Sequence, residues 1–123
     1  MLSFLPAPVR GIIAALLLVL NTLFHAPILF VFALIKLVPI PPLRTWCTRV
    51  MIRIAEFWIS CNSGWMALSG RTRWDIEGLE RLDYNGWYLV TSNHQSWVDI
   101  LALQHVLNRH MPMLKFFLKQ ELI

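Results

Sequence analysis

The residues most capable of chemistry in this chain are a histidine and an aspartate five positions apart, His94 and Asp99. On an uninterrupted helix, residues at this spacing are rotated by roughly 140° about the axis, so their side chains do not meet. They can meet if His94 lies in a loop and Asp99 lies in the first turn of the helix that follows. Ser96-x-x-Asp99 has the form of a capping box, with Ser96 as the N-cap. We therefore expect the loop to fold His94 back over the start of a helix.

A histidine paired with an aspartate in this way is suited to general-base catalysis. A carboxylate beside one ring nitrogen selects the tautomer and stabilises the imidazolium. The other nitrogen can then take a proton from a hydroxyl group, and an unperturbed histidine pKa of about 6.5 suits that task. The helix N-terminus and the loop amides can stabilise an oxyanion. The pattern predicts a hydroxyl that attacks a thioester directly, without a protein nucleophile.

The spacing alone also fits a purely structural role, and by itself it favours that role. Asp99 would then only cap the helix, and His94 would be a polar loop residue. Two ligands do not make a convincing metal site, so no metal is expected. Serine hydrolase chemistry has less support, because neither Ser92 nor Ser96 lies in a G-x-S-x-G elbow.

The segments around the pair alternate between strand and helix patterns. Residues 74–77 alternate apolar and polar side chains, and 87–91 are rich in aromatic and β-branched residues, so both are predicted strands. An Asn-Gly turn at 83–86 separates them. Residues 96–108 are a predicted helix, and 111–119 alternate again. Strand, helix, strand is the βαβ order of a parallel sheet, so the expected fold class is α/β.

A second predicted helix, from 43 to 68, carries an apolar stripe at three- and four-residue steps. The polar residues Arg49, Arg53 and Glu56 are expected away from that stripe. The helix can lie along a membrane interface, dock the following segment onto the membrane part, or be a plain core helix. The stripe consists of Trp46, Val50, Ile54, Phe57, Cys61, Trp65 and Leu68.

The N-terminal part is long and apolar enough to enter a membrane. Residues 11–35 contain no formally charged side chain, and as one helix they would reach roughly 38 Å, against about 30 Å of hydrocarbon. A signal peptide is a poorer match, because no A-x-A-like cleavage site follows. A buried core helix is disfavoured, because the rest of the chain is too small to surround it.

The topology of this apolar part stays open. Pro27 is expected to divide it into segments 9–24 and 28–38, and the prolines at 39, 41 and 42 end it. A kinked single span and a re-entrant hairpin are both possible. In either case the arginines that follow favour a cytoplasmic location for the remainder.

The charge balance supports a membrane surface rather than a nucleic acid. The chain has a formal net charge of +4 at neutral pH, and five arginines follow the apolar part: Arg44, Arg49, Arg53, Arg71 and Arg73. Such cations attract anionic lipid head groups. No aromatic and basic platform for nucleic acid accompanies them.

The two cysteines lie fourteen residues apart and are expected to be small apolar residues in a reducing compartment.

The segment Asn93-His94-Gln95-Ser96-Trp97-Val98-Asp99 resembles the N-H-x-S-x-x-D signature (an HxxxxD motif) of the glycerolipid acyltransferase family. With the apolar N-terminus, the chain most resembles bacterial 1-acylglycerol-3-phosphate acyltransferases. The preceding strand pattern at 87–90 and the later segment 115–122 also fit, so the resemblance runs from about Trp74 to the end.

This resemblance implies phospholipid biosynthesis: transfer of a fatty acyl group from acyl-CoA or acyl-carrier protein to a lysophospholipid, with lysophosphatidic acid as the expected acceptor. It implies His94 as general base, Asp99 as its orienting partner and Lys119 near the substrate phosphate. Asn93 and Ser96 would support the loop. It further implies no cofactor beyond the acyl donor, and a bacterial inner membrane location with the catalytic part on the cytoplasmic face.

The family's next block, an E-G-T-R-like element that binds the acceptor phosphate, does not occur in this sequence. We therefore expect an N-terminal fragment with a membrane segment at 1–42, a docking helix at 43–69 and the start of an acyltransferase domain at 70–123. The fragment alone is expected to be inactive, and turnover of lysophosphatidic acid by it would refute this. The alternatives are a membrane-anchored pseudoenzyme without catalysis and a small structural membrane protein.

Overall fold

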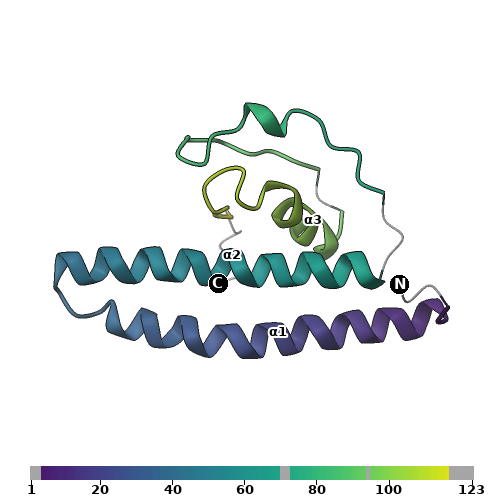
Figure 1. The fold of residues 1–123 in the computed structure, drawn as a ribbon, viewed down its shortest axis with the longest axis horizontal. Coiled ribbons are helices and arrows are strands. Elements are labelled where there is room, and N and C mark those ends of the chain that lie inside the picture. The colour runs from purple at the N-terminus through teal and green to yellow at the C-terminus, as the bar shows by residue number, and fades with distance from the viewer. Residues whose placement is uncertain (1–3, 70–72, 94, 117–123) are drawn as a thin grey trace.

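The computed structural model describes residues 4–69, 73–93 and 95–116, and within these ranges the fold is helical. Two long helices, α1 (Ala7–Ile35) and α2 (Pro41–Ser69), are followed by a short 3-10 helix, η1 (Leu79–Arg81), and by α3 (Trp97–Leu107). Figure 1 shows α2 in the middle of the arrangement, with α1 along one side and α3 on the other. Both α1 and α3 contact α2.

The α1 helix is a single element of 29 residues, so it is about 43 Å long at 1.5 Å per residue. It begins where prolines are tolerated, with Pro6 at the N-cap and Pro8 in the first turn. It continues through Pro27, so the predicted division at this residue is wrong. Figure 1 shows a gentle bow rather than a sharp bend. By length and composition, α1 can cross a membrane.

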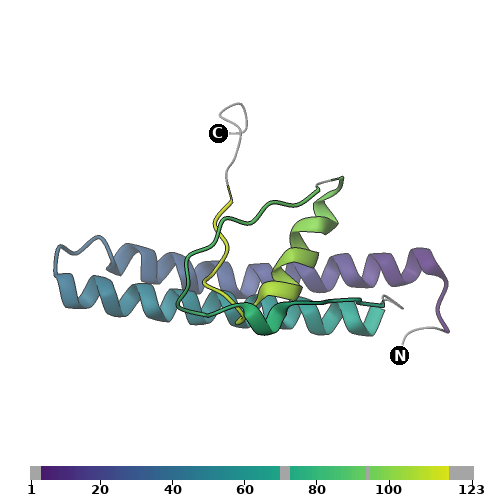
Figure 2. The ribbon, with the colours of Figure 1, turned by 90° about the horizontal axis from the view of Figure 1, so that it is seen from above.

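The α1 and α2 helices lie side by side and antiparallel along most of their lengths, as both ribbon views show (Figures 1 and 2). Polar side chains join their central turns. The Asn21 amide nitrogen donates to the Asn62 side-chain oxygen at 2.6 Å and to the Trp58 carbonyl at 3.1 Å. The Trp58 indole donates to the Thr22 hydroxyl at 3.3 Å. These directional contacts fix the register of the hairpin, because apolar packing alone has little directional preference.

The helix predicted over 43–68 is confirmed as α2, but its predicted apolar stripe is not its buried face. Among residues 41–67 of α2, whose burial is described, the buried ones are Cys47, Ala55, Glu56, Ile59 and Asn62. Trp46 and Phe57 from the stripe are more than half exposed. The reason is that α2 packs against two neighbours, α1 and α3, so more than one of its faces is covered. Glu56 is predicted to lie away from the apolar stripe, and it is buried there.

The strands predicted at 74–77 and 87–91 are wrong within the described part of the chain, where both segments are extended but form no strand. An extended backbone becomes a strand only when a neighbour supplies ladder hydrogen bonds. Neither segment has such a neighbour here, and Trp87 is 100% exposed. Residues 111–116 also form no strand, and 117–119 lie outside the described residues. The α/β fold class is therefore not confirmed.

Candidate active site

The helix predicted over 96–108 is confirmed as α3, and its first turn holds the aspartate of the motif. Ser96 is the N-cap, with φ −153° and ψ 162°, and it forms the predicted capping box with Asp99. The Asp99 Oδ2 atom accepts hydrogen bonds from the backbone nitrogens of Gln95 at 2.6 Å and Ser96 at 2.7 Å. A carboxylate at this position is also favoured by the positive end of the helix dipole. Asp99 therefore fixes both the start of α3 and the last residues of the preceding loop.

The Asp99 carboxylate occupies two backbone N–H groups of the loop, those of Gln95 and Ser96. Because the Gln95 and Ser96 N–H groups both donate to Asp99, these two amides are not available to an oxyanion. The expectation that the loop amides stabilise an oxyanion is wrong for this pair. His94 and Lys119 lie outside the described residues, so the contact between His94 and Asp99 stays a prediction. Asn93 and Ser96 are both exposed, and the Ser96 backbone nitrogen donates to Asp99.

Large apolar side chains within the motif and on the segment before it are exposed at the protein surface. Trp97 and Val98, in the first turn of α3, are 80% and 62% exposed. Leu89, on the extended segment before the motif, is also largely exposed. An apolar surface of this kind suits contact with acyl chains, because burial stabilises by about 25 cal/mol per Å² of apolar area.

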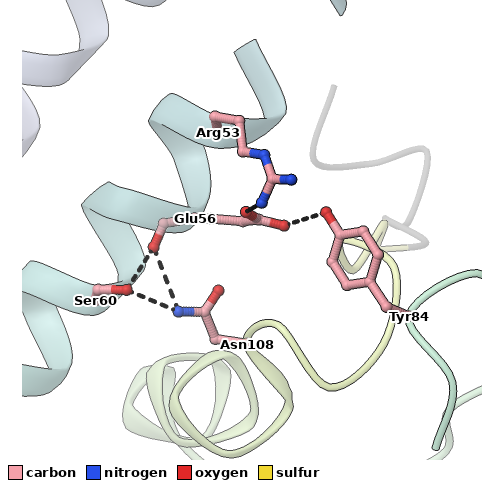
Figure 3. Close-up of polar contacts among 5 residues, drawn as sticks. All are labelled: Arg53, Glu56, Ser60, Tyr84 and Asn108. Carbon is pink, nitrogen blue, oxygen red and sulfur yellow. Dashed lines mark hydrogen bonds and ion pairs between the residues drawn. The ribbon is translucent and has the colours of Figure 1, made fainter. Parts of the chain in front are cut away.

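A buried carboxylate attaches the motif-bearing segment to α2, as Figure 3 shows. Glu56 is 2% exposed, and its carboxylate accepts a hydrogen bond from the Tyr84 hydroxyl and pairs with Arg53 Nη1 at 3.2 Å. The Glu56 carbonyl accepts from the Asn108 amide at 3.3 Å, and Asn108 also donates to the Ser60 hydroxyl at 3.0 Å. We call these five residues the Glu56 cluster. It holds both the turn before the motif and the C-cap of α3.

Tyr84 reaches Glu56 because of the predicted turn, which the structure confirms. The Asp83 side chain accepts from the Asn85 backbone nitrogen at 2.9 Å, and the Gly86 nitrogen donates to the Asp83 carbonyl at 2.9 Å. The hydrogen bond to Glu56 raises the pKa of Tyr84 above its usual value, and partial burial and the Glu56 charge act in the same direction. The nearby Arg53 and Arg109 oppose this rise.

Sequence reasoning missed the Glu56 cluster as a functional element. The only available signal was an acidic residue within a basic helix face, which usually indicates an exposed intrahelical ion pair. The partners Tyr84 and Asn108 lie 28 and 52 residues away along the chain, so no local pattern identifies them. The cluster nonetheless determines where the motif sits relative to α2.

Neither metal ligation nor cysteine pairing is seen in the described part of the chain. No group of three or more His, Cys, Asp or Glu side chains in it could hold a metal ion. Cys47 is buried and Cys61 is half-buried, and both are free thiols.

Comparison with known proteins relates the C-terminal part of the chain to one family. The sequence model of the Acyltransferase family matches residues 73–123, which contain the turn, the motif and α3. No curated protein and no solved structure matches the chain significantly. The segment that α2 holds through the Glu56 cluster is therefore similar in sequence to the acyltransferase family.

Proposed function

We propose that this protein transfers a fatty acyl group from a thioester donor, acyl-CoA or acyl-carrier protein, to the free hydroxyl of a lysophospholipid. The observation that supports this most is the motif's position. Within an acyltransferase-family segment, Asp99 is fixed at a loop-to-helix junction by two backbone amides, one of them on the residue that follows His94. Lysophosphatidic acid is the acceptor that we propose, with phosphatidic acid as the product.

In the proposed reaction, His94 takes the proton of the acceptor hydroxyl while the hydroxyl oxygen attacks the thioester carbonyl. The tetrahedral intermediate collapses, the carbon–sulfur bond breaks, and the thiolate receives the proton from the imidazolium. The products are a new ester and a free thiol, and His94 returns to its neutral state. Asp99 orients the ring and stabilises the imidazolium. Lys119 would bind the acceptor phosphate, while Asn93 and Ser96 support the loop.

We further propose that the α1–α2 hairpin is seated in one leaflet of a membrane rather than crossing it. α2 lies along most of α1 and carries Arg44, Arg49 and Arg53 (Figure 1). A charged side chain at the bilayer centre costs roughly 2.5–3.5 kcal/mol even on insertion scales, so carrying α2 across with α1 would be unfavourable. A shallow hairpin leaves the motif at the membrane surface, where lysophospholipids reside. The cytoplasmic face of a bacterial inner membrane is the location that we propose.

The direct test is an assay of the protein, expressed from its own reading frame, in membrane vesicles. A panel of lysolipids and of acyl donors with different chain lengths is supplied, and the diacyl products are separated and quantified. We expect phosphatidic acid to form fastest, with one equivalent of free thiol released per ester. Membrane binding without transfer to any acceptor would contradict the proposal and indicate a non-catalytic membrane protein.

A further inference from the structure

A groove between α1 and α2 lies apart from the motif. It has a volume of about 460 Å³, and its apolar walls are Phe24, Trp46, Val50, Ile54 and Phe57. This volume falls within the range of roughly 300–1,000 Å³ that is typical of small-molecule sites. Four of these residues belong to the apolar stripe that the sequence predicts on α2. The part of the stripe that α1 leaves uncovered therefore forms the groove.

Two guanidinium groups border the apolar walls. Arg49 and Arg53 lie one helical turn apart on α2, and both are exposed. Arg53 pairs with Glu56 at 3.2 Å, whereas Arg49 makes no hydrogen bond or ion pair with any described residue. Like charges at this spacing repel each other. An anion between them would relieve that repulsion, and guanidinium groups bind phosphate oxygens in a bidentate manner.

A buried histidine adds a polar group to the groove. His25 is 5% exposed, and its Nδ1 atom lies 2.8 Å from the Asn21 carbonyl oxygen. Its ring contacts Phe24 and Phe57, with centroids 5.0 and 5.6 Å away. The Nε2 atom has no hydrogen-bond partner among the residues that the structure describes. A ligand with an acyl chain and a polar ester or phosphate matches this combination better than an alkane or an inorganic anion would.

We propose that this groove binds one anionic phospholipid, with an acyl chain along the apolar walls and the phosphate between Arg49 and Arg53. The positive charges of Arg49 and Arg53 favour a lipid with an anionic head group. The apolar walls of the groove favour a ligand that carries an acyl chain. The groove runs beside α1, which is long and apolar enough to contact the bilayer that supplies such lipids. It shares no residue with the motif at 93–99, so the bound lipid is not the reacting substrate. Because Arg53 also pairs with Glu56, the lipid would adjoin the Glu56 cluster.

The test measures lipid retention. Purified protein is mixed with phosphatidic acid and phosphatidylcholine of identical chains, and the lipids that remain bound are counted by native mass spectrometry. We expect a preference for phosphatidic acid that Arg49→Gln lowers by roughly tenfold, since a charge-assisted hydrogen bond is worth about that factor. Arg44→Gln is the matched control, because Arg44 is exposed on the same helix but does not line the groove. Equal losses in both variants would show diffuse attraction and overturn the proposal.

A second variant tests the apolar walls without changing charge. Val50→Phe fills the groove, so it should lower retention of phosphatidic acid several-fold while the helical circular dichroism stays unchanged. Unchanged retention of phosphatidic acid in this variant would show that the lipid does not bind in the groove and would overturn the proposal.

Competition with inorganic phosphate tests whether the site binds a lipid or only a small anion. Inorganic phosphate at millimolar concentration should not displace the lipid, and full displacement would indicate a small-anion site instead. These readouts do not depend on turnover, so they stand apart from the test of acyl transfer.

Discussion

Asp99 combines two tasks at one carboxylate, and the two tasks can be separated by mutation. Oδ2 accepts from the backbone nitrogens of Gln95 and Ser96, which is a stabilising role at the start of α3. The proposed catalytic role depends on its charge beside His94. An amide in its place keeps one acceptor oxygen and loses the charge.

We expect Asp99→Asn to lower kcat by roughly a thousandfold or more, because the imidazolium loses its counter-charge and the ring its preferred tautomer. Ser96→Ala is the control. It removes a capping hydroxyl at a cost of about 1 kcal/mol in stability but leaves the carboxylate, so its kcat should stay within about threefold. Kinetics and thermal unfolding of both variants check this. Equal loss of rate in both would assign Asp99 a structural role only.

Tyr84→Phe tests the Glu56 cluster by removing one hydrogen bond to a buried carboxylate. Such bonds contribute roughly 1.5–3 kcal/mol, and the partial exposure of Tyr84 lowers the expected loss to about 1–2 kcal/mol. Tyr88→Phe removes a more exposed phenol hydroxyl, which accepts from the Asp83 nitrogen at 2.7 Å, and should cost less than about 1 kcal/mol. Chemical unfolding followed by circular dichroism measures both. The reverse order of losses would contradict the assigned role of the cluster.

The raised pKa of Tyr84 predicts a stability change at alkaline pH. The folded state holds this proton more tightly than the unfolded chain, where the pKa is about 10. The contribution of Tyr84 to stability is therefore complete below that pH and is lost as the pH rises through the raised value in the folded state. The unfolding midpoint should fall above about pH 10, and Tyr84→Phe should flatten part of that fall. An unchanged slope in the variant would argue against the shift.

At the level of elements, the α1–α2 hairpin depends on a paired amide contact. Asn62 is buried, and its side-chain oxygen accepts from Asn21 at 2.6 Å. Asn62→Leu should cost about 1–3 kcal/mol, because it leaves the Asn21 amide without that partner. The double change Asn21→Leu and Asn62→Leu should recover at least half of the loss. Unfolding of the single and double variants measures the coupling, and strictly additive losses would mean that the pair does not set the register.

Local patterns were enough to predict helices in the regions of α1, α2 and α3, although not the continuity of α1 through Pro27. The apolar run predicts α1, the proline cluster and three- to four-residue steps predict α2, and Ser96-x-x-Asp99 predicts the start of α3. What failed depends on neighbours that are distant in sequence. Strand formation at 74–77 and 87–91 requires a pairing partner, and the burial of Glu56 requires Tyr84. The division at Pro27 failed because a helix can continue through one proline when its other hydrogen bonds persist.

At the scale of the whole molecule, the α1–α2 hairpin, which we propose lies in a membrane, carries the motif-bearing segment on α2. If the hairpin lies in one leaflet, the N-terminus and the turn at 83–86 face the same side of the membrane. Cysteines introduced one at a time at Phe4 and Asp83, in a background with Cys61→Ala and the buried Cys47 retained, should both react with an impermeant maleimide from one side of sealed vesicles. The background protein without an introduced cysteine is the control for Cys47. Labelling from opposite sides would show that α1 crosses the bilayer.

The central claim is that one imidazole removes the proton from a lipid hydroxyl, and His94→Ala measures this most directly. The protein is expressed from its own reading frame, unchanged or with His94→Ala or His110→Ala, and formation of phosphatidic acid from acyl-CoA and lysophosphatidic acid is compared in vesicles that hold equal amounts of each. His110 is an exposed histidine outside the motif, so it controls for the substitution itself. We predict loss of nearly all transfer in His94→Ala, with membrane binding retained and His110→Ala unaffected. Undiminished transfer by His94→Ala would contradict the account.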